Sequence, residues 1–169
     1  PEHFILFKPK DIVSGDFYWI TENKGKVFFA VCDCTGHGVP GAFMSMIGSS
    51  LLNEVVNEKG VNTPGAIFDE VRLGFINALK QTTDDVQQKD GMDAILCSLD
   101  QNRKLEFAAA YNPLFLIRDG ELRDYKADAQ PVGFHQGVET PFTNQELTLV
   151  KNDVIYLLSD GFQDQFGGP

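Results

Sequence analysis

The chain has 169 residues, of which 43% are hydrophobic and 22% charged, a balance typical of one globular domain with its own core. Its formal net charge is −10 and no basic stripe is present, which argues against nucleic acid or an anionic membrane surface as its main partner. No apolar stretch is long enough to span a bilayer and no signal-peptide pattern occurs, so we expect a soluble domain without direct membrane contact.

The three cysteines favour a reducing compartment. Cys32 and Cys97 lie in strand-like segments and the set is odd, so we expect no disulfide framework and a cytoplasmic location. Cys32 and Cys34 could form half of a zinc site, but no second Cys/His pair stands at ligand spacing. The chain begins at Pro1 without an initiator methionine, and we expect residues 1–169 to be a single domain from a longer protein.

The first predicted element is a hairpin made of two apolar runs, 16–20 and 27–32. A two-residue turn at Lys24-Gly25 would pair residues whose numbers sum to 49, so that Asp16 faces Asp33. Directly opposed residues of an antiparallel pair point to the same face, with Cβ atoms roughly 4.5–5.5 Å apart. Both faces of the hairpin are apolar, so we expect a covering layer on each.

Asp16, Asp33 and Asp160 each stand at the end of an apolar run, with glycine close by. Two opposed carboxylates repel each other unless they share a proton or bind a cation. Oxygen ligands without a nearby set of Cys and His favour a hard divalent ion such as magnesium or manganese. The simpler alternative is that aspartate ends strands because it suits turns and solvated edges.

Two helices are predicted next. Pro40 suits the first turn of a helix, and apolar residues repeat at helical spacing as far as Val55. Thr63-Pro64 combines a cap with a helix-start proline, and a second apolar stripe runs to Lys80.

From residue 90 onward the pattern changes to strands, and residues 127–144, which are rich in proline and glycine, are expected to form a long surface loop. Strands that bracket a helix pair indicate an α+β fold, with two antiparallel sheets face to face and helices outside. The strands are expected at 94–99, 105–110, 114–118, 121–125, 147–150 and 154–159.

Four stretches, in order along nearly the whole chain, resemble the motifs of the SpoIIE/RsbU-type serine phosphatases. This family belongs to the metal-dependent (type 2C, PPM) protein phosphatase superfamily. The resemblance implies a four-layer α-β-β-α sandwich with a binuclear Mn²⁺ or Mg²⁺ centre, truncated here before the strand that carries the family's final metal-binding Asp. The four stretches are Asp11-Ile12-Val13-Ser14-Gly15-Asp16-Phe17-Tyr18-Trp19, Asp33-Cys34-Thr35-Gly36-His37-Gly38-Val39-Pro40-Gly41-Ala42, Asn112-Pro113 and Ser159-Asp160-Gly161-Phe162.

The resemblance also implies roles for single residues. Asp33 would bridge the two ions, the backbone carbonyl of Cys34 would complete one coordination shell, and Asp16 and Asp160 would hold the ions from either side.

Three further residues have two interpretations each. Asp90 and Asp93 fall where the family approaches the metal centre and a third, weaker ion, but both also suit turn chemistry at the start of a strand. His37 would lie near the leaving group as a catalytic residue, or it is a loop or capping histidine. A centre that lacks the family's final Asp is expected to hold its metals loosely.

The implied activity is hydrolysis of phosphoserine or phosphothreonine on a bacterial signalling protein, through a water activated by two metal ions and without a protein nucleophile. No Cys-x5-Arg loop, Gly-x-Ser-x-Gly elbow or nucleotide-binding loop is present to suggest another chemistry. The implied substrate is a phosphorylated anti-sigma-factor antagonist, and the parent protein allows a dimer. The alternatives are a catalytically weak phosphoprotein-binding or regulatory module that keeps the fold, and a purely structural cation site.

Overall fold

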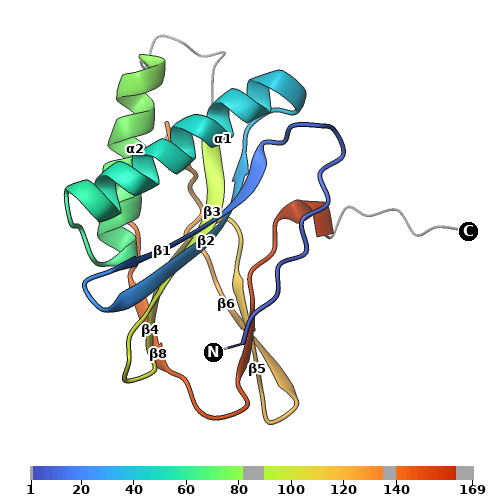
Figure 1. Cartoon of the computed structure of the whole chain (residues 1–169), viewed down its shortest axis with the longest axis vertical. Coiled ribbons are helices and arrows are strands. Elements are labelled where there is room, and N and C mark those ends of the chain that lie inside the picture. Colours follow the sequence, from blue (N-terminus) through green and yellow to red (C-terminus); the bar gives the residue numbers. More distant parts are fainter. Residues whose placement is uncertain (1, 82–89, 135–139, 163–169) are drawn as a thin grey trace, which may run out of the picture.

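The computed structural model describes residues 2–81, 90–134 and 140–162, which form two antiparallel sheets and two long helices (Figure 1). The predicted α+β class is confirmed. In chain order the elements are β1 (Asp16–Asn23), β2 (Lys26–Cys34), α1 (Gly38–Asn53), the π-helical turn η1 (Glu54–Glu58), α2 (Pro64–Leu79), β3 (Gly91–Leu99), β4 (Lys104–Ala110), β5 (Leu114–Arg118), β6 (Glu121–Tyr125), β7 (Val132–Gly133), β8 (Gln145–Thr148), β9 (Val154–Tyr156) and the 3-10 turn η2 (Asp160–Phe162).

The large sheet has the strand order β1-β2-β3-β4-β8, with β7 added beside β3, and the small sheet has the order β6-β5-β9. Both long helices lie on the same side of the large sheet (Figure 1). The described residues therefore form three layers: the two long helices, the large sheet and the small sheet. The family resemblance implies a second helical layer, and the described residues do not include it. None of the described helices combines the length and the apolar character needed to cross a membrane.

The first hairpin has the predicted register. Lys24 and Gly25 have φ angles of 50° and 76°, as a two-residue type I′ turn requires. This turn pairs Asn23 with Lys26 and, seven residues further along each strand, Asp16 with Asp33. The prediction that these two aspartates are cross-strand neighbours is confirmed.

The helix side of the large sheet is continuously buried. One row across four strands joins Trp19, Ala30, Leu96 and Ala108, each at most 6% exposed. Helices α1 and α2 cover this row, and they approach closely because Gly48 leaves room for the ring of Phe75 on α2. Apolar burial on this face is the main source of stability for the helix layer.

The other face of the large sheet is covered only in part. Small-sheet residues such as Leu116 pack against Ile95 and Phe107 on β3 and β4, whereas Tyr18 and Ile20 on β1 are 47% and 48% exposed. The expectation that both hairpin faces are buried is therefore wrong at β1. The three-stranded sheet is narrower than the sheet it covers, and it sits over β3 and β4.

The described residues of 127–144 form the expected loop only in part. Strand β7 pairs with the start of β3, and Gly133 fits there because a Cβ atom would come within 2.7 Å of the Gly91 Cα. Phe142 is 5% exposed, packs edge to face against Phe68 and lies under the guanidinium of Arg72. Tertiary packing has placed Gln130, Val132 and Phe142 in the core, whereas Ala129, Pro141 and Thr143 stay exposed. Residues 135–139 lie outside the described chain.

The last strands are shorter or shifted relative to the prediction. Strand β8 covers Gln145–Thr148 rather than 147–150, and β9 ends at Tyr156 rather than at residue 159. Pairing of β9 with β5 stops at Tyr156, after which the chain leaves the small sheet and brings Ser159 back to β1.

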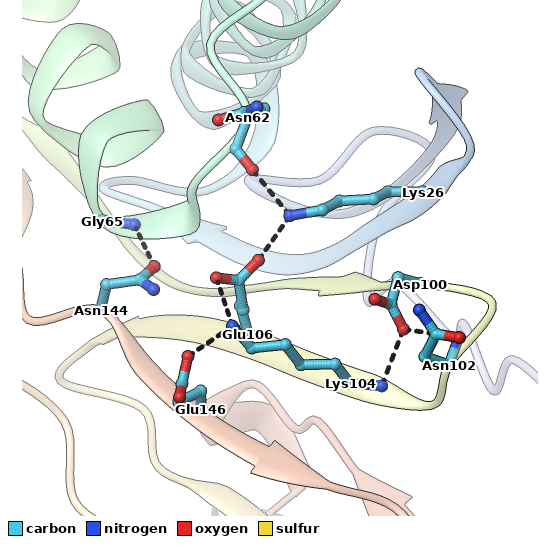
Figure 2. A network of polar contacts seen from close by, with 9 residues as sticks. All are labelled: Lys26, Asn62, Gly65, Asp100, Asn102, Lys104, Glu106, Asn144 and Glu146. Atoms are coloured by element: carbon cyan, nitrogen blue, oxygen red, sulfur yellow. Dashed lines mark hydrogen bonds and ion pairs between the residues drawn. The ribbon is translucent and has the colours of Figure 1, made fainter.

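A polar network closes the end of the large sheet where β2 begins (Figure 2). The Glu106 carboxylate on β4 accepts hydrogen bonds from Lys26 and Lys104, and Lys104 also reaches Glu146 on β8. Lys26 lies 3.4 Å from the carbonyl oxygen of Asn62, in the loop before α2. The network thus ties β2, β4, β8 and the helix layer together.

Candidate metal centre

Three aspartates lie in one row across neighbouring strands at the opposite end of the large sheet. The register pairs Asp16 on β1 with Asp33 on β2, and Asp33 with Asp93 on β3. Residues in such a row point to the same face of a sheet. This face is the one that carries Ile95, so the three carboxylates lie on the small-sheet side.

A fourth aspartate comes from the segment that follows β9 of the small sheet. Turn η2 begins at Asp160, whose carboxyl group lies close enough to that of Asp33 to raise the pKa of Asp33. The neighbouring Ser159 donates a hydrogen bond of 2.9 Å from its Oγ to Oδ2 of Asp16. The predicted residues Asp16, Asp33 and Asp160, which are up to 144 positions apart in sequence, therefore meet at one site.

The surroundings of Asp33 and Asp93 disfavour the ionised form of their carboxyl groups. Burial first, and then the negative charges and close carboxyl groups of Asp16 and Asp160, together raise the pKa of Asp33 to about 8. Burial, with the charge of Asp160 added, raises the pKa of Asp93 to about 6. A cation or a shared proton would relieve this repulsion.

Glycines allow the loop after β2 to approach β1 closely. A Cβ atom on Gly15 would lie 2.7 Å from the carbonyl oxygen of Cys34 and 2.8 Å from that of Gly36. A Cβ atom on Gly41 would lie 2.5 Å from the same Gly36 oxygen. Larger residues at these two positions would push the loop away from the aspartates, so the glycines near the motif are packing requirements.

The Cys34 side chain lies on the other face of β2, in the core beneath the helices. Burial, followed by the charge of Asp33, raises the pKa of this thiol well above its ordinary value. A neutral, buried thiol is a poor metal ligand, so only the backbone carbonyl of Cys34 remains a candidate.

The remaining two predicted site residues lie apart from the carboxylate row. Asp90 precedes β3, its backbone carbonyl accepts a 2.7 Å hydrogen bond from Gln81, and its charge is not among those that shift the pKa of Asp33 or Asp93. His37 is exposed at the N-cap of α1, with an extended backbone and no side-chain cap hydrogen bond.

Among the described residues, no group of three or more His, Cys, Asp or Glu side chains is placed so that it could hold a metal ion without rearrangement. Asp33 instead lies beside two acidic neighbours, Asp16 and Asp160, which raise its pKa. The donor set still fits a hard divalent cation, because its side-chain groups are all carboxylates and the influences on Asp33 all oppose its negative charge.

The sequence did not indicate the role of the Ser159 hydroxyl, which fixes one oxygen of Asp16. Its position directly before Asp160 in a Ser-Asp-Gly motif was visible. The partner of the hydroxyl was not, because the contact joins residues 143 positions apart.

The fold and this row of carboxylates define a two-sheet α+β domain with an acidic site at one end of its large sheet. The family model described as Stage II sporulation protein E (SpoIIE) matches residues 23–168. The chain belongs to this family, and the predicted resemblance is confirmed.

Known relatives agree with this assignment. The SiaA-PP2C domain of Pseudomonas aeruginosa is 34% identical and superposes with a TM-score of 0.84, covering 98% of this chain and 63% of that one. The phosphoserine phosphatase RsbU of Bacillus subtilis is 26% identical over 156 residues, which are 90% of this chain and 44% of RsbU. A structure of RsbX in complex with magnesium is 17% identical with a TM-score of 0.66, covering 92% of this chain and 71% of that one. The chain thus spans less than two thirds of SiaA-PP2C and less than half of RsbU.

Proposed function

We propose that this domain is a metal-dependent protein serine/threonine phosphatase that hydrolyses phosphoserine or phosphothreonine on a bacterial signalling protein. The observation that carries the proposal is the row of Asp16, Asp33 and Asp93, joined by Asp160 of turn η2. Membership of the SpoIIE family and similarity to a protein named phosphoserine phosphatase support the reaction type.

The proposed cofactor is Mn²⁺ or Mg²⁺, as two ions with a third, weaker one allowed. Asp33 would be shared between the ions, Asp16 and Asp160 would hold them from either side, and the Cys34 carbonyl would complete one shell. Asp93 is a better candidate than Asp90 for a further ligand, because the register places it beside Asp33. The magnesium complex of RsbX supports this choice of ion.

Divalent ions bound here would activate a water molecule for attack on phosphorus and screen the charge of the phosphoryl oxygens. The protein's own contribution would be to orient the ligands: Ser159 fixes one Asp16 oxygen, and Gly15 lets the Cys34 carbonyl come close to β1. His37 is proposed as a catalytic residue near the leaving group. Its imidazole is exposed and is not engaged in capping α1, so it is free to meet a substrate.

The proposed partner is a phosphorylated anti-sigma-factor antagonist in the cytoplasm, and the parent protein is proposed to supply any dimer contacts. Similarity to RsbU supports a place in bacterial signalling. The competing proposal is a regulatory module that keeps the fold but binds phosphoproteins without turnover.

The test is hydrolysis of a chromogenic phosphate ester with manganese, by the wild-type chain and by Asp33→Asn. We expect the variant to lose more than roughly 100-fold in rate, since a shared ligand should matter more than an outer-shell contact. Asp124→Asn is the matched control, because it removes the same charge from an exposed position on β6 and should hydrolyse like the wild type.

Comparable rates for Asp33→Asn and the wild type would contradict the assignment of the site. A wild-type chain that binds manganese and a phosphorylated peptide without releasing phosphate would support the regulatory module instead.

A further inference from the structure

Thr35, directly after Asp33 and Cys34, is bound to the backbone of Gly91 by three hydrogen bonds. Its backbone N–H donates to the Gly91 carbonyl at 3.0 Å, and its hydroxyl donates to the same oxygen at 3.3 Å. The Gly91 N–H in turn donates to the Thr35 Oγ1 at 3.1 Å. We name this set of contacts the Thr35 latch.

The Thr35 latch lies just beyond the last residue pair of the β2–β3 ladder, Cys34 with Met92. Asp33 pairs with Asp93 and Cys34 with Met92, so Thr35 and Gly91 come next, just beyond the last residue of β2. The latch is therefore two positions from each of the paired aspartates.

A latch would stabilise this end, because the register places the carboxyl groups of Asp33 and Asp93 directly opposite each other on β2 and β3. The negative charge of Asp160 acts on both Asp33 and Asp93, which sit on neighbouring strands. Like charges on neighbouring strands destabilise their pairing. A hydroxyl that both donates to and accepts from the same residue resists separation and sliding of the two backbones.

Gly91 is also fixed on its other side. Gly133 of β7 packs backbone to backbone against it, and Gln81 holds the carbonyl of Asp90 at 2.7 Å. The start of β3 is thus anchored to β7 and to the end of α2, and Thr35 connects this anchored segment to β2.

We propose that Thr35 is a positioning residue of the metal centre, whose hydroxyl holds the end of β2 against Gly91 and so sets the spacing between Asp33 and Asp93. The inference rests on the proposed function, because it assigns Asp93 to the same site. Thr35 is assigned a role through the two aspartates and not as a ligand, since its hydroxyl is engaged with Gly91 both as a donor and, through its oxygen, as an acceptor.

The experiment compares Thr35→Val, which keeps the branched shape without the hydroxyl, with Thr35→Ser, which keeps the hydroxyl. Thr35→Ala repeats the loss of the hydroxyl without adding a methyl group. Thr21→Val is the matched control, because Thr21 lies on β1 away from the aspartates and its hydroxyl also makes a side-chain hydrogen bond, to Asn57 at 3.2 Å.

Three quantities are measured on each chain: manganese affinity by calorimetric titration, the manganese concentration for half-maximal ester hydrolysis, and amide hydrogen exchange at Gly91. We expect Thr35→Val and Thr35→Ala to weaken manganese binding roughly 10-fold, to raise the half-maximal concentration by the same factor, and to speed exchange at Gly91. Thr35→Ser should restore all three, and Thr21→Val should change none.

Wild-type manganese affinity in Thr35→Val and Thr35→Ala would overturn the inference, as would failure of Thr35→Ser to restore it. An equal loss in Thr21→Val would do the same. If the wild type binds manganese but no chain hydrolyses the ester, the proposed function fails, while the binding and exchange measurements still decide the role of Thr35.

Discussion

The two ends of strand β2 carry charged groups in opposite arrangements. At its start, Lys26 meets the buried carboxylate of Glu106, which Lys104 also contacts (Figure 2). At its far end, Asp33 meets Asp16 and Asp160, which carry the same charge.

The pKa shifts at the two ends have opposite signs for this reason. Burial disfavours the charge on Glu106, but the hydrogen bonds and charges of Lys26 and Lys104 outweigh it and lower its pKa. Burial also disfavours the charge on Asp33, and there the neighbours add to the effect. Burial of a carboxylate is therefore a weak sign of function, and a buried carboxylate without an opposite charge is a stronger one.

Lys26→Met should remove the main ion pair of Glu106 and give the largest change in stability. Glu106 would keep only its weaker contact with Lys104, so we expect a loss of about 2 kcal/mol in the free energy of unfolding, typical of a buried polar partner left unpaired. Urea denaturation with a chelator present measures it. Lys59→Met, which removes an exposed lysine from ion pairs with Glu54 and Glu70, should leave the midpoint unchanged. Equal losses in both variants would show that burial of the pair contributes nothing.

Asp33→Asn, at the other end of β2, should change the free energy of unfolding in the opposite direction. Without metal at pH 8, replacing the crowded carboxylate removes repulsion, so we expect stabilisation on the order of 1 kcal/mol, well below the full pKa shift because solvent screens a half-exposed group. Thermal unfolding in chelator, compared with Asp124→Asn, measures it. Destabilisation by Asp33→Asn would mean that the carboxylate makes a favourable contact that outweighs the repulsion.

The smallest expected effect is on the pH dependence of stability, which should differ between the two ends of β2. Glu106 has a lowered pKa, so its contribution is present above its ordinary value of 4.5 and is lost as the pH falls through the folded pKa. Asp33 has a raised pKa, so the metal-free protein loses stability as the pH rises from 3.8 towards 8. Melting temperatures in chelator should therefore depend less on pH below 4.5 in Glu106→Gln, and less between pH 4 and 8 in Asp33→Asn. A slope unchanged from wild type in either variant would remove that residue from the explanation.

Local chemistry made part of the site predictable. The Lys24-Gly25 turn sets the register of the hairpin by itself, so the pairing of Asp16 with Asp33 followed from residues within one short stretch. The two helices were equally visible, because a cap or a proline and a stripe of apolar residues are local signals.

Asp90 and Asp93 show where such signals stop. Both precede or begin the same strand, and the sequence offered the same two interpretations for each. The β2–β3 register sets Asp93 beside Asp33, while Asp90 stands before the strand. That register joins segments about sixty residues apart, and no turn between them fixes it.

The sequence by itself determined the family, the α+β class and the first hairpin, and it singled out Asp16, Asp33 and Asp160. Each of these depends on a short-range pattern or motif. Only the tertiary structure decided that the small sheet leaves Tyr18 exposed, that Phe142 enters the core, and that Asp93 rather than Asp90 joins the row. These outcomes depend on how far one sheet extends over another and on which distant strands pair. They are set by the burial of whole surfaces, which no short segment specifies alone.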